Sequence, residues 1–239
     1  MDQPIDLSIV IPVFNEEESL PILFDELTRA LQPAARTYEI ICINDASTDN
    51  SATVLSDLQR EHAELVVVTH RMNCGESAGQ ASGFKRARGE IIITMDADLQ
   101  NDPADIPAFL QALTADVACV CGVRKVRQDD FVKRFSSRTA NKFRDLITGD
   151  HIQDAGCTYR AIRRYALGEM LVFNGMHRFL PTILKAQGYQ VREILVNHRP
   201  RVKGYSKYGV GNRLWRGIRD CFAIRWYRAR TIVAERQES

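Results

Sequence analysis

The first half of the chain alternates short apolar runs with segments of helical pattern. The runs rich in β-branched residues predict buried strands at Leu7–Phe14, Tyr38–Ile43, Leu65–Thr69, Ile91–Met95 and Val117–Val123. The segments between them predict helices near Glu18–Leu31, Ser51–Glu61, Ala78–Ala87 and Ala104–Thr114. Strict alternation of strand and helix predicts an α/β fold with a doubly wound, mostly parallel sheet.

From about Phe131 the pattern changes to basic amphipathic segments. One continues to Ile147 and a second runs from Leu214 to Tyr227, and both place Lys or Arg between apolar residues at three- and four-residue spacing. Basic amphipathic helices that carry tryptophan suit a membrane interface. Packing on the core, with the basic side chains reaching outward, explains the first segment equally well. For the second segment the alternative is a dimer surface.

Composition and charge narrow the class of protein. The chain has 239 residues, of which 45% are hydrophobic, which suits a sizeable core and argues against disorder. The net charge is only +2, but Lys and Arg crowd about the last forty residues, which suggests phosphates or anionic lipid as partners. The six cysteines show no CxxC spacing, so we expect reduced thiols in the cytoplasm. Without a recognisable signal peptide or an apolar stretch of about 20 residues, any membrane contact is expected to be peripheral.

Polar and acidic residues follow three of the predicted strands. Because ligands of such sheets bind beyond the carboxyl ends of the strands, these residues are expected to converge on one edge. The sequence Asp96-Ala97-Asp98, with Gln100 two positions further, offers hard oxygen ligands that can hold Mg²⁺ or Mn²⁺ together with substrate phosphates. A polar turn in which Asp102 caps a helix beginning near Pro103 explains the same residues without a metal.

Three motifs resemble the family-two glycosyltransferases of the GT-A fold, especially the polyprenyl-phosphate sugar transferases. They are Ser8–Glu17, Asn44–Asp49 and Met95–Pro103, and the likeness extends more weakly to Gly204–Lys207. The resemblance implies a single domain over 1–239 with a Rossmann-like sheet. Residues 1–124 would bind a nucleotide-sugar, and the basic amphipathic region at 125–239 would bind the acceptor and face a membrane.

The resemblance also implies roles for the matching residues. Those lining the nucleotide base and ribose would be Pro12, Phe14, Glu16 and Glu17. Asp45 would accept a hydrogen bond from a base nitrogen, although Asn44 stands where the family often has a first Asp. Asp98 and Gln100 would ligate the metal, with Asp96 nearby on the ribose or the metal.

Further matching positions would serve the acceptor and the leaving group. Arg124, at the end of a strand, would meet an acceptor phosphate, with weaker matches at Lys133 and Ser137. Asp154 is the candidate base if the acceptor is a hydroxyl. Arg201 and Lys207 resemble a basic pair that closes over the donor diphosphate. A solvated basic loop is the alternative explanation of that pair.

The expected reaction is an inverting transfer of a sugar from a nucleotide-sugar, UDP favoured over GDP, to a polyprenyl phosphate at the cytoplasmic membrane face. One rival is transfer to a sugar hydroxyl in polysaccharide or lipid A type assembly. A nucleotidyltransferase is disfavoured because acidic residues, and not a Gly-rich loop, follow the first strand. A catalytically silent nucleotide-sugar-binding partner is disfavoured by the intact Asp96, Asp98 and Gln100. We expect no nucleic-acid partner, and a homo-oligomer is compatible with these features.

Overall fold

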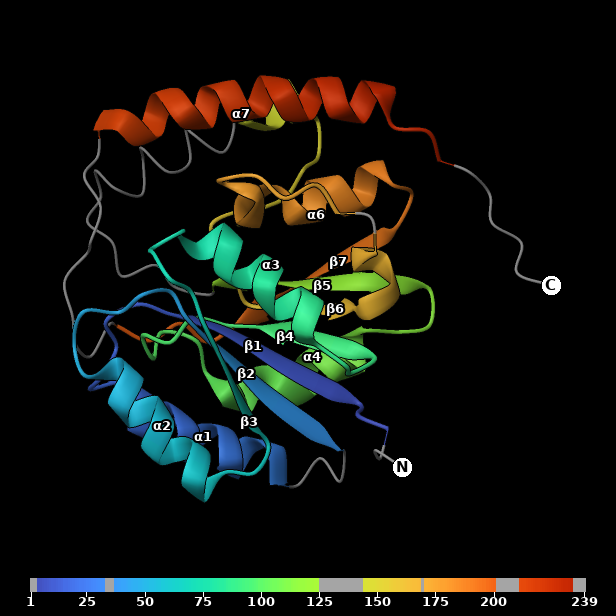
Figure 1. Cartoon of the computed structure of the whole chain (residues 1–239). Helices are drawn as coiled ribbons and strands as arrows, with labels where there is room; N and C mark the ends of the chain where they lie inside the picture. The colour runs from blue at the N-terminus through green and yellow to red at the C-terminus, as the bar shows by residue number, and fades with distance from the viewer. Residues whose placement is uncertain (1–3, 33–36, 125–143, 169, 201–210, 234–239) are drawn as a thin grey trace.

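A seven-stranded sheet forms the centre of the molecule (Figure 1). The computed structural model describes residues 4–32, 37–124, 144–168, 170–200 and 211–233. The strands lie in the order β3-β2-β1-β4-β6-β5-β7, and only β6 runs antiparallel to its neighbours. Their bounds are β1 Leu7–Val13, β2 Tyr38–Asn44, β3 Leu65–Thr69, β4 Ile91–Thr94, β5 Val117–Arg124, β6 Arg160–Arg163 and β7 Gln190–Val196.

Helices cover both faces of the sheet. Their bounds are α1 Leu20–Leu31, α2 Ser51–Glu61, α3 Glu76–Arg86, α4 Ile106–Ala112, α6 Met176–Ala186 and α7 Gly211–Arg230, with short 3₁₀ helices η2 Pro103–Asp105 and η3 Arg164–Leu167. Alternate β1 residues face opposite layers, because successive side chains of a strand point to opposite sides. Ile9 packs in the core on the α1, α2 and α4 side, and Val10 packs beneath α3 with Phe84. Helix α7 forms an outer layer on α6 (Figure 1).

The predicted α/β class and mostly parallel sheet are confirmed. All five predicted strands are present with ends within one residue of the prediction. The four predicted helices are also present, the last divided into η2 and α4. The sequence pattern did not reveal β6, β7 or α6. Strand β6 has only four residues with arginine at both ends, and α6 carries an internal proline, Pro181, so neither presents a clear period.

Small residues allow α3 to lie close to the sheet. A Cβ atom built on Gly83 would stand 2.2 Å from Val10 Cγ1 and 3.0 Å from Ile43 Cδ1. One built on Gly79 would stand 3.0 Å from the Cβ atom of Pro12. This close approach brings the amino end of α3 to the carboxyl edge of β1 and β2, where the polar loops gather.

The amphipathic tail is helical as expected. In α7, Cys221 and Ile224 are buried in a cluster with residues of α6, whereas Phe222 and Trp226 are 57% and 66% exposed. Of the first amphipathic segment, residues 131–143 lie outside the described residues, and Leu146 beyond them is 79% exposed. None of the described helices is long and apolar enough to cross a membrane.

Candidate active site

The loops that follow β1 and β2 are hydrogen-bonded to each other at the carboxyl edge of the sheet. Thr48 N donates to Asn15 Oδ1 at 2.7 Å, and Asn50 N donates to the Glu17 carboxylate at 2.8 Å. Glu16 N donates to Ser51 Oγ at 2.8 Å. Glu16 and Glu17 therefore lie at the predicted edge, and the Glu17 carboxylate orders the neighbouring loop.

Three turns at this edge hold a residue other than glycine in the left-handed region. Asn15 follows β1 with φ 56°, Ala46 follows β2 with φ 57°, and Leu99 follows β4 with φ 64°. This conformation costs an alanine or leucine about 1–2 kcal/mol. Strained backbone of this kind persists where the surrounding contacts hold it, and it gathers at functional sites. The three turns lie where the sequence placed its polar motifs.

Asp45 is buried beneath the loop that precedes α3. Its Oδ1 atom accepts from Cys74 N at 2.9 Å and contacts His70 Nδ1 at 2.6 Å, and its Oδ2 atom accepts from Gly75 N at 2.7 Å. His70 Nε2 in turn lies 2.8 Å from Ser82 Oγ. One carboxylate oxygen of Asp45, one ring nitrogen of His70 and the sulfur of Cys74 lie within 4.8 Å of one another. Asp45 therefore orders the 73–75 loop in the place predicted for the nucleotide base, near the half-buried Pro12 and Phe14.

Asp96 and Asp98 form a close acidic pair beyond β4. Asp96 accepts from the Thr158 hydroxyl at 2.8 and 2.9 Å, and Asp98 Oδ1 accepts from Gln100 N at 3.2 Å. Burial, and then repulsion by Asp98, raise the pKa of Asp96 to about 6. A bound cation would relieve this repulsion, and two carboxylates with an amide oxygen are ligands that Mg²⁺ and Mn²⁺ accept. The residues present therefore fit a divalent cation.

The structure adds two residues from the end of β7 to this acidic edge. His198 Nε2 lies 3.5 Å from the Gln100 amide nitrogen, and Asn101 forms a β-bridge with His198. Arg199 pairs with Asp102 at 2.7 Å and with Glu26 at 2.7 Å. Asp102 also accepts from Ala104 N, so the helix cap expected from the sequence is present beside the acidic pair. The sequence offered no signal for His198, because its neighbour Gln100 is 98 positions away.

Arg124 and Asp154 are brought together as an ion pair. Arg124 Nε donates to Asp154 Oδ2 and an Arg124 terminal nitrogen donates to Oδ1, both at 2.7 Å. Both side chains are largely buried, at 15% and 10% exposure. The sequence predicted separate roles for them, Arg124 as a contact of the acceptor phosphate and Asp154 as a candidate base. In the structure the charge of each side chain neutralises that of the other. The pair lies close enough for Arg124 to favour the ionised form of Asp96.

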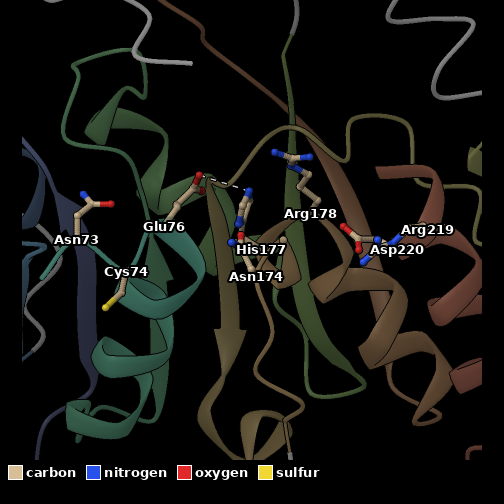
Figure 2. Close-up of a pocket in the computed structure, with 10 residues that line it drawn as sticks. Asn73, Cys74, Glu76, Asn174, His177, Arg178, Arg219 and Asp220 are labelled. Carbon is tan, nitrogen blue, oxygen red and sulfur yellow. Dashed lines mark ion pairs between the residues drawn. The ribbon is translucent and has the colours of Figure 1, made fainter. Parts of the chain in front are cut away.

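Two cavities share one wall, and the smaller of them reaches the acidic residue Asp96. The sequence offered no signal for Glu76 or Arg178 in that wall. The larger, of about 550 Å³, extends from the 73–75 loop to Arg219 and Asp220 of α7 (Figure 2). The smaller, of about 270 Å³, reaches Asp96 and Thr158. Both cavities are lined by Glu76, His177 and Arg178. These residues begin helices α3 and α6, and only the packing of those helices brings them together.

Four predicted residues lie outside the described residues. They are the candidate acceptor contacts Lys133 and Ser137 and the candidate diphosphate contacts Arg201 and Lys207. Arg199, which precedes the latter two in the sequence, is described and pairs with Asp102.

Several solved structures share this fold at low sequence identity. Glucosyl-3-phosphoglycerate synthase from Mycobacterium tuberculosis, in complex with Mg²⁺ and uridine diphosphate, aligns with 93% of this chain and 79% of its own, at TM-score 0.67 and 14% identity. A mannosyltransferase from Pyrobaculum calidifontis, in complex with GDP-mannose and Mn²⁺, aligns with 93% of this chain and 63% of its own, at TM-score 0.63 and 16% identity. The architecture is therefore that of GT-A glycosyltransferases.

Relatives found by sequence have a higher sequence identity to this chain than these solved structures do. An undecaprenyl-phosphate 4-deoxy-4-formamido-L-arabinose transferase from Aeromonas hydrophila is 38% identical over 205 residues, and one from Pseudomonas fluorescens is 40% identical over 205 residues. These alignments cover 85% of this chain but 63% and 60% of the relatives, so the chain spans somewhat less than two thirds of their length. The sequence profile of glycosyl transferase family 2 matches residues 8–171. The chain therefore belongs to glycosyl transferase family 2.

Proposed function

We propose that this protein transfers a sugar from a nucleotide-sugar, with UDP favoured over GDP, to a polyprenyl phosphate. The observation that carries the proposal is the position of Asp96, the partner of Asp98, at a cavity that shares its wall with a second cavity at the loop ordered by Asp45. The names of the Aeromonas and Pseudomonas relatives support a polyprenyl phosphate as the acceptor.

The donor would lie along the carboxyl edge of the sheet. Its base would meet Asp45 and the Pro12, Phe14, Glu16 and Glu17 loop, and its diphosphate would lie by Asp98 and Gln100. These two residues, with Asp96 nearby, would hold Mg²⁺ or Mn²⁺, and His198 adds a further candidate ligand. The ion would supply positive charge against the diphosphate that leaves. Arg201 and Lys207 are proposed to stabilise the same charge.

The ion pair between Arg124 and Asp154 favours a phosphate acceptor over a sugar hydroxyl. A hydroxyl acceptor needs a base, but both oxygens of Asp154 are engaged by Arg124. A lipid phosphate is already an anion near neutral pH. One of its oxygens would attack the anomeric carbon as the bond from that carbon to the diphosphate oxygen breaks. The nucleoside diphosphate would leave and the configuration would invert.

The exposed part of α7 supports peripheral contact with the membrane that holds the acceptor, which we place at the cytoplasmic face. Phe222 and Trp226 are exposed, and the exposed Arg219 lies one helical turn before Phe222 on the same helix. Aromatic side chains enter the headgroup region while arginines meet anionic lipid.

The test is direct transfer to an extractable lipid. The protein is incubated with radiolabelled UDP- and GDP-sugars, Mn²⁺ or Mg²⁺, and a short polyprenyl phosphate, and labelled lipid is extracted into organic solvent. We expect labelled lipid with one donor class, and none with chelator or with Asp98→Asn. Transfer to a saccharide hydroxyl in place of the lipid phosphate would contradict the proposed acceptor.

A further inference from the structure

The two cavities share one wall, and together they extend from the loop ordered by Asp45 to Asp96 of the proposed metal site. The larger begins at Asn73, Cys74 and Gly75, and the smaller ends at Asp96. In a nucleotide-sugar the sugar is attached to the diphosphate at the end away from the ribose and base, so it must lie within reach of the proposed metal site. The smaller cavity, which opens beside Asp96, is the space available to such a sugar, and Glu76, His177 and Arg178 line it.

The shared wall is built by two helix starts that are held rigidly together. The buried Ser77 hydroxyl accepts from Gly175 N at 3.0 Å and lies 2.8 Å from His177 Nδ1. His177 Nε2 lies 3.4 Å from a Glu76 carboxylate oxygen, the contact drawn as a dashed line in Figure 2. The fully buried Arg160 donates to the His177 carbonyl at 2.6 Å. A wall held in this way keeps its polar groups in fixed positions before a ligand arrives.

Arg178 brings a positive charge to a wall that also carries carboxylates. In the part of the chain that the structure describes, its half-buried guanidinium has no hydrogen bond or ion pair. The same cavity is lined by the carboxylates of Glu76 and Asp96. A phosphate that is not accompanied by a cation would be repelled by these two carboxylates. A neutral sugar hydroxyl or amide can donate to a carboxylate and accept from a guanidinium, so it fits both charges.

From this arrangement we infer that Glu76 and Arg178 bind the polar substituents of the donor sugar and determine which sugar the protein accepts. The inference rests on the proposed function, and it deepens that function by assigning sugar selectivity to the starts of α3 and α6. A polar group that the bound sugar shields from water discriminates strongly, because a sugar lacking the matching substituent leaves that group unsatisfied.

The experiment compares binding of several UDP-sugars with binding of UDP alone. Isothermal titration calorimetry with Mn²⁺ measures the dissociation constants of UDP, UDP-glucose, UDP-galactose, UDP-xylose and UDP-N-acetylglucosamine for the wild type, Glu76→Gln and Arg178→Met. Matched controls are Glu61→Gln and Arg86→Met, which change exposed residues at the ends of α2 and α3. Circular dichroism and thermal melting establish that each variant is folded.

We expect the variants to change the ratios between UDP-sugar affinities by about tenfold or more, the size of one lost charge-assisted hydrogen bond. Their affinity for UDP itself should stay within about twofold of the wild type, and the controls should change neither quantity. Unchanged ratios in folded variants would overturn the inference, as would an equal loss for UDP and every UDP-sugar. Failure of the wild type to bind any nucleotide or nucleotide-sugar would instead contradict the proposed function, and this inference with it.

Discussion

Asp98 and Gln100 are the residues on which a divalent cation would depend. Replacing Asp98 by asparagine keeps the shape of the side chain but removes its charge. We expect Asp98→Asn to weaken donor binding in Mn²⁺ about tenfold or more, to the level of the wild type in chelator, because hard cations need anionic oxygen ligands. Calorimetric titration of the preferred donor with and without Mn²⁺ measures this. Equal wild-type affinity in Mn²⁺ and in chelator would rule out the metal role.

The Arg124 and Asp154 pair makes single substitutions hard to interpret, so a double variant is needed. Removing one partner leaves the other charge buried, and we expect Arg124→Met to lower the free energy of unfolding by about 3 kcal/mol. The double variant Arg124→Met with Asp154→Leu should recover most of that loss. Urea unfolding measures both quantities.

The same double variant tests the proposed role of Arg124 at the acceptor. If Arg124 contacts the acceptor phosphate, the double variant should regain stability but keep a raised KM for polyprenyl phosphate. If the double variant has the acceptor KM and the turnover of the wild type, the ion pair has a structural role only.

Among the elements, α3 depends most closely on small residues where it meets the sheet. We expect Gly83→Ala to destabilise the protein by about 1–3 kcal/mol, because the added methyl would overlap Val10 and force the helix outward. Gly217→Ala on α7 is the matched control, since no atom lies within 4 Å of its added Cβ, and it should stabilise by up to about 1 kcal/mol. Urea midpoints compare the two. A neutral Gly83→Ala would show that α3 can move away from β1 at little cost.

Helix α7 is the element proposed to contact the membrane. Replacing Phe222 and Trp226 together by glutamate should abolish co-sedimentation with vesicles of anionic lipid, because it removes exposed apolar area and adds repulsion. Tyr165→Glu, at an exposed aromatic residue of η3, is the control and should leave binding unchanged. Raised salt should weaken wild-type binding. Vesicle binding that survives the double substitution would show that another part of the protein contacts the membrane.

At the scale of the whole molecule, a buried carboxylate ties together segments distant in sequence. Glu39 of β2 accepts from Ser8 Oγ and Arg88 N, both at 2.7 Å, and pairs with Arg88 Nε at 3.0 Å. Burial alone would raise the pKa of Glu39, but the hydrogen bonds from Arg88 and Ser8 outweigh burial and leave its pKa lowered.

This lowered pKa predicts a loss of stability in acid. The unfolded chain then binds the proton more tightly, so the contribution of Glu39 is fully present above its ordinary pKa of 4.5 and is lost as pH falls through the folded value. We expect Glu39→Gln to be less stable than the wild type at pH 7 and to approach it near pH 3. Urea unfolding from pH 7 to pH 3 measures the difference. A stability difference independent of pH would show that folding does not shift the pKa of Glu39.

The sequence determined the sheet of the first half and the three polar loops at its edge. The apolar runs of β1 and β2 are local properties, and parallel strands necessarily bring their carboxyl ends to one edge. For this reason Asp45, Asp96 and Asp98 could be placed from the sequence.

Only the tertiary structure decided which charges neutralise each other and which face a cavity. The contact of Arg124 with Asp154 and that of Ser77 with His177 join residues 30 and 100 positions apart. The cavity wall of Glu76 and Arg178 exists only because glycines let α3 lie against β1 and because α6 packs beside it. Pairings between distant residues depend on how the layers pack, and no local period in a sequence encodes them.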